Sequence, residues 1–142
     1  MIVYIGAAID AVSVPPAEQF QELGNIVVEA LGKDVVIFNP FGAFLNANLI
    51  TDPEDLQFVV ETNFASLDAS DIAVFIFSDS CSFGVPLEIY HCSSNGKPFV
   101  VWYKSTKNPG IYLRHYSKNI VFTKEDLVNK IRELLQDCVK RG

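Results

Sequence analysis

The stretch from Asp71 to Tyr103 constrains the fold more than any other part of the sequence. Two apolar runs rich in Val, Ile and Phe, at Ile72–Phe77 and Phe99–Tyr103, flank a polar middle. Runs of this length and composition are typical of strands that are buried on both faces. Between them, Pro86 suits the first turn of a helix, and Asn95-Gly96 ends that helix. The pattern therefore predicts strand, helix and parallel strand, a βαβ unit of about 30 residues.

Strand and helix alternate along the rest of the chain. Further strands are expected at Met1–Ile5, Val35–Phe38 and Asn119–Phe122, and helices from Pro15-Pro16 to Leu31, from Thr51 as cap to Leu67, and after the cap Thr123. The stripe expected to be buried in the middle helix comprises Leu56, Val59, Val60, Phe64 and Leu67. This alternation predicts an α/β fold with three layers, α/β/α, around a flavodoxin-like, five-stranded parallel sheet of order 2-1-3-4-5. A chain of 142 residues is expected to form a single domain, 1–142.

Composition argues against several classes of partner. The net charge of −6, without a basic stripe, disfavours a nucleic acid polymer. No apolar run approaches the roughly 20 residues that span a bilayer, and we expect neither a signal peptide nor a membrane partner. Three cysteines, Cys81, Cys92 and Cys138, are odd in number and lack the spacing of metal ligands. Reduced thiols in a cytoplasmic protein, and no metal site, are therefore expected.

Glu88 is the first candidate functional residue. It is expected in the first turn of the helix after the strand Ile72–Phe77, at the edge where parallel sheets bind their ligands. The free N–H groups and the dipole of a helix start favour an ionised carboxylate, which could act as a nucleophile. The alternative is an acidic residue that merely decorates a helix start. With the predicted strand order, Tyr4, Gly6, Ser82 and Glu88 would surround one cleft at the switch point of the sheet.

Two further positions have two interpretations each. Phe41, in the loop from Asn39 to Ile50, either takes part in ligand recognition or packs beneath the loop. Asn63 lies on the apolar stripe of its helix, so its amide either satisfies a backbone group in the core or reaches the ligand. His91 and His115 are too distant in sequence to predict a metal pair, and each is expected to be structural.

Taken together, these features resemble the nucleoside 2-deoxyribosyltransferase superfamily, which includes a branch that hydrolyses deoxynucleoside 5′-monophosphates. The segment Val3–Ala7 looks like the family's opening strand with its site tyrosine, here Tyr4. The segment Ser82–Glu88, with Gly84 in the middle, matches the family's D/S-x-G-x-x-x-E pattern, which carries the catalytic glutamate. Gly96-Lys97-Pro98 matches the family's GKP before the fourth strand. The resemblance covers most of the chain in the same order.

The resemblance implies a function and a role for each matching residue. Glu88 would attack C1′ of a 2-deoxyribosyl group and form a covalent glycosyl-enzyme, and Tyr4 would hydrogen-bond Glu88 and hold its orientation. The implied activity is cleavage and transfer at the N-glycosidic bond of 2-deoxyribonucleosides, without a cofactor. The implied partner is a small-molecule nucleoside or nucleotide. A homodimer or higher homo-oligomer is also implied, in which the neighbouring subunit would bring Tyr112 to the site.

Departures from the family pattern leave two alternatives. Asn63 stands where the family usually has Asp, so Asp68 or Asp10 would have to protonate the leaving base. Ser82 resembles the hydrolase of deoxynucleoside 5′-monophosphates, because a hydroxyl can donate to a phosphate, whereas Asp10 replaces an Arg of that branch. That hydrolase is the first alternative. The second is a nucleotide-binding protein that has lost its catalytic activity. Asn63 and Gly110 suggest this alternative.

Overall fold

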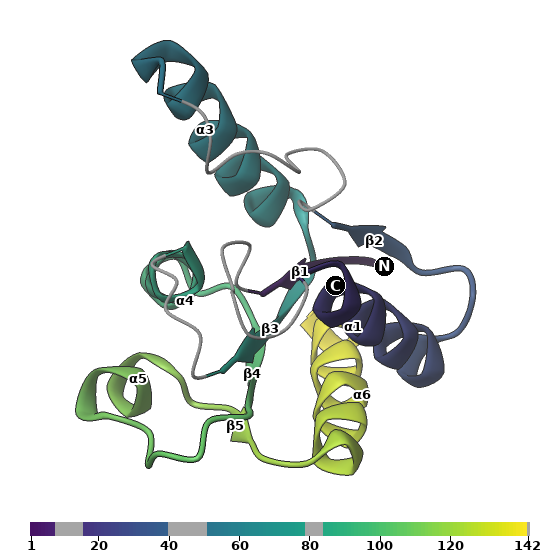
Figure 1. The fold of residues 1–142 in the computed structure, drawn as a ribbon. Helices are drawn as coiled ribbons and strands as arrows, with labels where there is room; N and C mark the ends of the chain where they lie inside the picture. Colours follow the sequence, from purple (N-terminus) through teal and green to yellow (C-terminus); the bar gives the residue numbers. More distant parts are fainter. Residues whose placement is uncertain (8–15, 40–50, 79–83, 142) are drawn as a thin grey trace.

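A computed structural model describes residues 1–7, 16–39, 51–78 and 84–141 of the chain (Figure 1). Five strands alternate with helices, as the sequence predicts, and the structure adds a short helix at Ile111–Tyr116, where the sequence pattern predicts no element. In chain order the elements are β1 (Ile2–Gly6), α1 (Pro16–Leu31), β2 (Val36–Phe38), α3 (Pro53–Ala69), β3 (Ile72–Phe77), α4 (Gly84–Ser94), β4 (Phe99–Tyr103), α5 (Ile111–Tyr116), β5 (Ile120–Val121) and α6 (Lys124–Arg141). Among these, no helix is both long and apolar enough to cross a membrane.

The five strands form one parallel sheet in the order β2-β1-β3-β4-β5, which confirms the predicted order. The chain leaves β1 toward β2 on one side and returns to β3 on the other. The carboxyl ends of β1 and β3 therefore lie side by side, and Gly6 is in register with Phe75. This reversal of direction is the switch point at which open α/β sheets bind their ligands.

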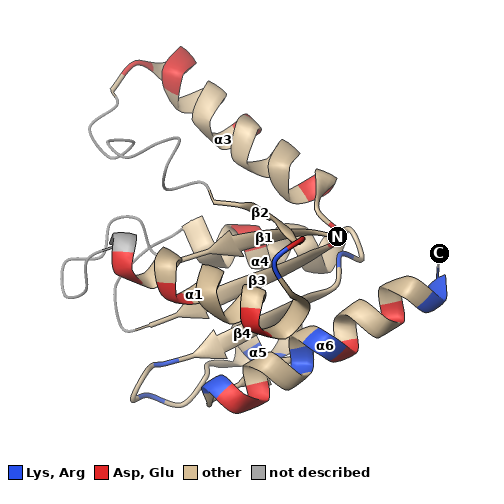
Figure 2. Ribbon diagram, turned by 90° about the vertical axis from the view of Figure 1, so that its right-hand side faces the viewer, with Lys and Arg blue, Asp and Glu red and all other residues tan. Residues whose placement is uncertain are grey.

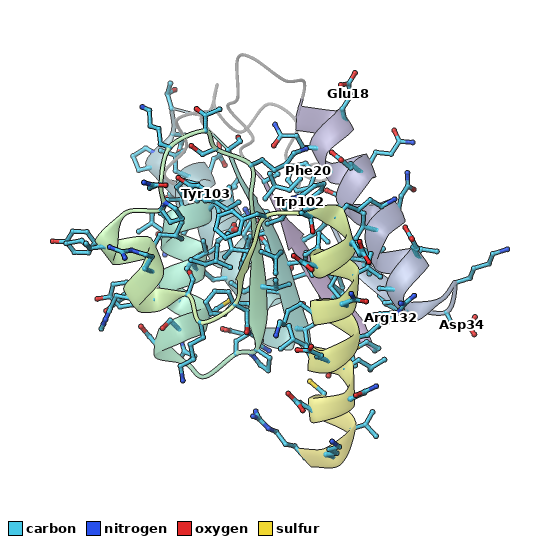
Figure 3. All side chains as sticks on the ribbon, turned by 90° about the horizontal axis from the view of Figure 1, so that it is seen from below. Glu18, Phe20, Asp34, Trp102, Tyr103 and Arg132 are labelled. Carbon is cyan, nitrogen blue, oxygen red and sulfur yellow. The ribbon has the colours of Figure 1, made fainter. Side chains whose placement is uncertain are left out.

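Helices cover both faces of the sheet, as Figure 1 shows: α1 and α6 lie on one face, and α3, α4 and α5 lie on the other. Because side chains alternate along a strand, Val3 and Ile5 enter the core beneath α1 and α6, whereas Tyr4 enters the opposite core. Figure 3 shows Phe20 of α1 and Trp102 of β4, both in the first of these cores. The side chain of Arg132 on α6 donates to the carbonyls of Glu29 and Ala30 at the end of α1.

Helix boundaries follow local chemistry, and one cap differs from the prediction. Gly32, with φ of 93°, ends α1, and the Thr123 hydroxyl accepts from the Asp126 N–H at the start of α6, as expected. The N-cap of α3 is Asp52 rather than Thr51. Its carboxylate accepts from the Glu54 N–H at 2.8 Å. The intervening Pro53 has no N–H to satisfy, which suits the first helical position.

The packing of α3 also differs from the prediction. Of the stripe expected to be buried, only Leu67 is inaccessible, while Leu56 is 42% exposed and Val60 is 51% exposed. In Figures 1 and 2 the helix projects away from the sheet, and only its C-terminal end lies against it. The side chain of Lys97 fastens that end, because its Nζ donates to the carbonyls of Asp68 and Ser70. The N-terminal part of the apolar stripe therefore has no sheet beneath it.

Candidate functional site

The candidate site lies at the carboxyl ends of β1 and β3. Strand β1 contributes Tyr4 and Gly6, which share one face of the sheet because they are two residues apart. Helix α4 covers that face by burying Val85, Ile89 and Cys92. Glu88 lies on the same side of α4, and this brings its carboxylate over the end of β1.

Tyr4 and Glu88 are joined by a hydrogen bond, although they are 84 residues apart in the sequence. The Tyr4 hydroxyl donates to Oε1 of Glu88 at 2.8 Å. The whole Tyr4 side chain is buried, so the donor is held in place by the core around it. This is the contact that the resemblance implied. It leaves the second oxygen, Oε2, without a hydrogen bond to any residue in the described part of the chain.

Gly6 provides the space for that second oxygen. A Cβ atom at this position would lie 2.9 Å from Oε2 of Glu88 and 2.5 Å from Cδ1 of Phe75. Both distances are shorter than real side chains tolerate, so a larger residue would displace the carboxylate or the ring. The sequence pattern places Gly6 at the cleft expected to bind the ligand. What approaches Gly6 in the structure is the carboxylate of Glu88 together with the ring of Phe75.

The protonation of Glu88 differs from the expectation. Burial raises the pKa of its carboxyl from 4.5 to about 7, and the hydrogen bond from Tyr4 offsets only part of this effect. A helix start was expected to keep the carboxylate ionised. However, α4 begins at Gly84, so Glu88 is the fifth helical residue and the first turn contains no acidic residue. Pro86 is the third, a position whose N–H has no partner within a helix. The dipole is therefore weaker at Glu88 than predicted, and desolvation dominates.

Two titratable groups beside Glu88 in the described part of the chain, Tyr4 and Cys92, stay neutral. Burial and the charge of Glu88 raise the pKa of Tyr4, so the hydroxyl remains a donor. Cys92 lies one helical turn after Glu88 and is fully buried, and burial together with the charge of Glu88 raises its pKa to about 12. The thiol is thus not a nucleophile at neutral pH. A carboxyl group that titrates near neutrality suits nucleophilic or acid–base work.

Asn63 and Asp68, both predicted to contact the ligand, lie at different positions along α3. Asn63 is half-buried on the same side as Leu67, and its amide makes no hydrogen bond to another described residue. The contact of this amide with a ligand stays a prediction. Asp68 lies four residues before β3, at the amino edge of the sheet, and its Oδ1 is 2.6 Å from Nε2 of His91. Asp68 is therefore at the edge opposite Glu88, and this placement does not support a role in protonating the base.

Other predicted residues are either outward-facing or outside the described residues. Asp10, Phe41 and Ser82 belong to segments that the structure does not describe, as does Cys81. Gly84 is the first residue of α4, so the predicted D/S-x-G-x-x-x-E segment runs directly into the helix that carries Glu88. Tyr112 is 76% exposed on α5. Its own chain's site does not enclose it, and the predicted contribution across a subunit interface stays a prediction.

Sequence reasoning missed two residues that shape this site. Phe75 presents its ring to Gly6, and Cys92 is the thiol closest in sequence to Glu88 on the buried side of α4. Strand alternation could have placed Phe75 on the same face as Tyr4, and the spacing of four could have placed Cys92 beside Glu88. His91, expected to be structural, pairs with Asp68 and contacts Phe64 in a tilted arrangement, with 4.6 Å between ring centroids.

A cavity of about 280 Å³ lies at the opposite, amino edge of the sheet. Lys97, Lys118 and Arg141 are among its lining residues, with Asp137 opposing them. Three helices, α4, α5 and α6, end around it. Cations at helix C-termini are the ordinary complement of the helix dipole. These charges are explained by that complement, and the cavity is not part of the candidate site.

Comparison with known proteins supports the fold. No family model and no curated protein matches the sequence. Among solved structures, the chain is similar to a 2-deoxyribosyltransferase from Bacillus psychrosaccharolyticus, with a TM-score of 0.70 and 16% identity over 91% of each chain. A conserved protein from Enterococcus faecalis V583 has a TM-score of 0.71 and 17% identity, over 94% of this chain and 98% of that one. The CMP N-glycosidase BcmB of Clostridium botulinum has a TM-score of 0.58 and 13% identity, over 92% of this chain and 97% of that one. This chain therefore shares its three-layer α/β/α fold with a deoxyribosyltransferase structure and a nucleotide N-glycosidase structure.

Proposed function

We propose that this protein cleaves the N-glycosidic bond of 2-deoxyribonucleosides and transfers the deoxyribosyl group to a second base. The reaction passes through a covalent intermediate on Glu88. One observation carries the proposal. At the switch point of the sheet, the Tyr4 hydroxyl holds Oε1 of Glu88 and leaves Oε2 unpartnered among the described residues. A carboxylate fixed by one oxygen and free at the other is arranged as a nucleophile. The similarity in fold to a 2-deoxyribosyltransferase structure supports this assignment.

The proposed reaction has two displacements at C1′ of the sugar. Oε2 of ionised Glu88 attacks C1′, the bond from C1′ to the base nitrogen breaks, and its electron pair leaves with the base, which takes up a proton. A second base then attacks C1′ through its nitrogen, loses a proton, and releases Glu88 as a carboxylate. This is the logic of retaining glycosidases, in which a carboxylate divides one difficult displacement into two easier ones. Tyr4 keeps Oε1 in place through both steps.

Protonation of the leaving base requires a donor or a hydrogen-bonding partner near the base. The amide of Asn63 can hydrogen-bond a base but cannot act as an acid. Asp68 is engaged with His91 at the opposite edge of the sheet, so Asp10 remains the acidic candidate named from the sequence. We infer that Asn63 orients the base. The proton that the leaving base takes up comes from another group or from solvent.

A hydrolase of deoxynucleoside 5′-monophosphates is the second candidate function. Ser82 favours it, because a hydroxyl can donate to a phosphate where a carboxylate would repel one. The similarity in fold to a CMP N-glycosidase structure is consistent with it. In that reaction water replaces the second base as the acceptor. The third possibility, a nucleotide-binding protein without catalysis, does not account for the free oxygen of Glu88.

The test is an incubation with each deoxynucleoside and each deoxynucleoside 5′-monophosphate, with and without a second free base, read by chromatography. A new nucleoside that forms only with the second base supports the transferase, and free base released from monophosphates alone supports the hydrolase. Glu88→Ala should abolish either activity, whereas Glu61→Ala, which removes an exposed carboxylate of α3, should not. Ligand binding without turnover in the unmodified protein would favour the binding protein.

We also propose that the protein forms a homo-oligomer. The exposed apolar residues Leu56 and Val60 of α3 support this, since exposed apolar surface of this kind marks interaction sites. Helix α3 contains four acidic residues and no Lys or Arg (Figure 2). The stripe with Leu56 and Val60 is itself free of charge, so two copies of the chain can meet there without burying a charged side chain in the contact.

A further inference from the structure

Three side-chain atoms converge on the backbone of Gly6 from two different elements. A Cβ built on Gly6 would lie 2.5 Å from Cδ1 and 2.7 Å from Cε1 of Phe75, and 2.9 Å from Oε2 of Glu88. The edge of the Phe75 ring and the free oxygen of Glu88 therefore occupy the same small space above one Cα atom. Gly6 and Phe75 are partners in the register of β1 and β3, so this arrangement is built into the sheet.

The Phe75 ring cannot retreat from that space, because the core surrounds it. Phe75 is fully buried. Its centroid lies 6.2 Å from that of Tyr4 in a tilted contact and 6.1 Å from that of Phe99 in an edge-to-face contact. Close-packed aromatic rings of this kind do not shift without cost. The ring is thus a fixed wall, and the Tyr4 that it touches is the residue that binds the other oxygen of Glu88.

We infer that Phe75 is a positioning residue for Glu88: the edge of its ring and the bare Cα of Gly6 form the seat that holds Oε2 in one place and limits its contact with water. The inference rests on the proposed function, in which Oε2 is the attacking oxygen. An aromatic edge carries partial positive charge, so it tolerates an oxygen that a ring face would repel. At the same time the ring occupies space that water would otherwise fill. The carboxylate is then confined between the Tyr4 hydroxyl at Oε1 and this seat at Oε2.

Substitution of Phe75 tests the seat. Phe75→Leu removes the ring edge with a modest loss of volume, and Phe75→Ala removes most of the wall. Phe20→Leu is the matched control, because Phe20 is equally buried but belongs to the core on the other face of the sheet. The first readout needs no turnover: the titration of the Glu88 carboxyl, followed by NMR of protein labelled with ¹³C at the glutamate carboxyl and assigned with Glu88→Gln.

Because burial is the main cause of the raised pKa of Glu88, admission of water should move its titration toward that of an ordinary glutamate. We expect the midpoint to fall by about one pH unit in Phe75→Leu and further in Phe75→Ala, and to stay unchanged in Phe20→Leu. Where Phe75→Ala does not fold, Phe75→Leu decides alone. A folded Phe75→Leu that titrates as the unmodified protein does would overturn the inference.

The second readout is kinetic and separates this inference from the proposed function. Loss of position of an attacking oxygen should lower kcat by about tenfold or more while KM changes by less than about threefold, and Phe20→Leu should leave both nearly unchanged. Equal kinetic losses in Phe75→Leu and Phe20→Leu would overturn the positioning role. If the unmodified protein turns over no nucleoside or nucleotide, the proposed function fails, while the NMR titration still tests the seat.

Discussion

Replacement of Glu88 by Gln should change how the stability of the protein depends on pH. The substitution keeps the size of the side chain and an oxygen that can accept from Tyr4, but removes one titrating group. In the folded protein the pKa of that group is raised to about 7, against 4.5 for an ordinary glutamate. Between these values the folded protein retains a proton that the unfolded chain has released. Its free energy of unfolding must therefore fall as the pH rises through this window.

The size of the effect follows from the shift itself. One pKa unit corresponds to about 1.4 kcal/mol, so burial of the Glu88 carboxyl can cost at most about 3 kcal/mol once the group is ionised. The stabilising contribution of the protonated form is complete below the ordinary pKa and is lost as the pH passes the folded one. Because the Glu88 side chain retains some exposure to solvent, which screens its charge, we expect the free energy of unfolding to fall by about 2 kcal/mol.

Urea unfolding followed by circular dichroism, at about pH 5 and about pH 8, measures this difference. The unmodified protein should lose about 2 kcal/mol more than Glu88→Gln between the two conditions. The two proteins differ in this one side chain alone, so the pH-dependent contributions of every other group cancel in the comparison. If the two proteins lose the same stability, the carboxyl of Glu88 is not desolvated, and the account of the site given above is wrong.

Three further substitutions test the site and the assembly. Tyr4→Phe removes the hydrogen bond that favours the carboxylate, so the acid limb of the pH profile of kcat/KM should move to higher pH and kcat should fall, as initial rates across pH will show. Gly6→Ala should destabilise the fold by about 1–3 kcal/mol and reduce activity, whereas Gly24→Ala, in open space on α1, should be neutral or stabilising in the same thermal unfolding assay. Val60→Asp should shift the protein toward monomer in sedimentation velocity, while Val139→Asp, at an even more exposed valine of α6, should not; equal behaviour of both variants would rule out α3 as the interface.

The fold could be predicted from the sequence because its signals are local. The two central strands occupy the apolar runs Ile72–Phe77 and Phe99–Tyr103, with the predicted bounds. Gly32 and Thr123 mark helix ends through a left-handed conformation and a capping hydroxyl, which are properties of single residues. Alternation of strand and helix then leaves few topologies for a parallel sheet, and the flavodoxin-like order is one of them.

The packing of α3 was not predictable, because an apolar stripe says which face seeks burial but not whether a sheet lies beneath it. A helix of 17 residues is about 25 Å long. The six residues of β3 span only about 20 Å, and α3 also tilts away from the sheet. Leu67 lies where the helix meets the sheet and is buried, whereas Leu56, eleven residues earlier, is not. The same stripe is therefore core at one end of the helix and surface at the other.

The candidate site was only partly predictable for a related reason. The position of Glu88 after a buried strand located a carboxylate at the binding edge, and the resemblance supplied its partner Tyr4, which no spacing could have found across 84 residues. The pKa of Glu88 depends instead on what three elements place around it: Tyr4 and Gly6 from β1, Phe75 from β3 and the buried side of α4. A dipole argument from the helix start predicts an ionised group, and burial reverses that prediction. A nucleophile with a pKa of about 7 is about half ionised at neutral pH, so the proposed activity should rise as the pH increases through neutrality, in the same window in which the fold loses stability. The burial that makes the Glu88 carboxylate reactive is thus also the reason why its ionisation destabilises the folded protein.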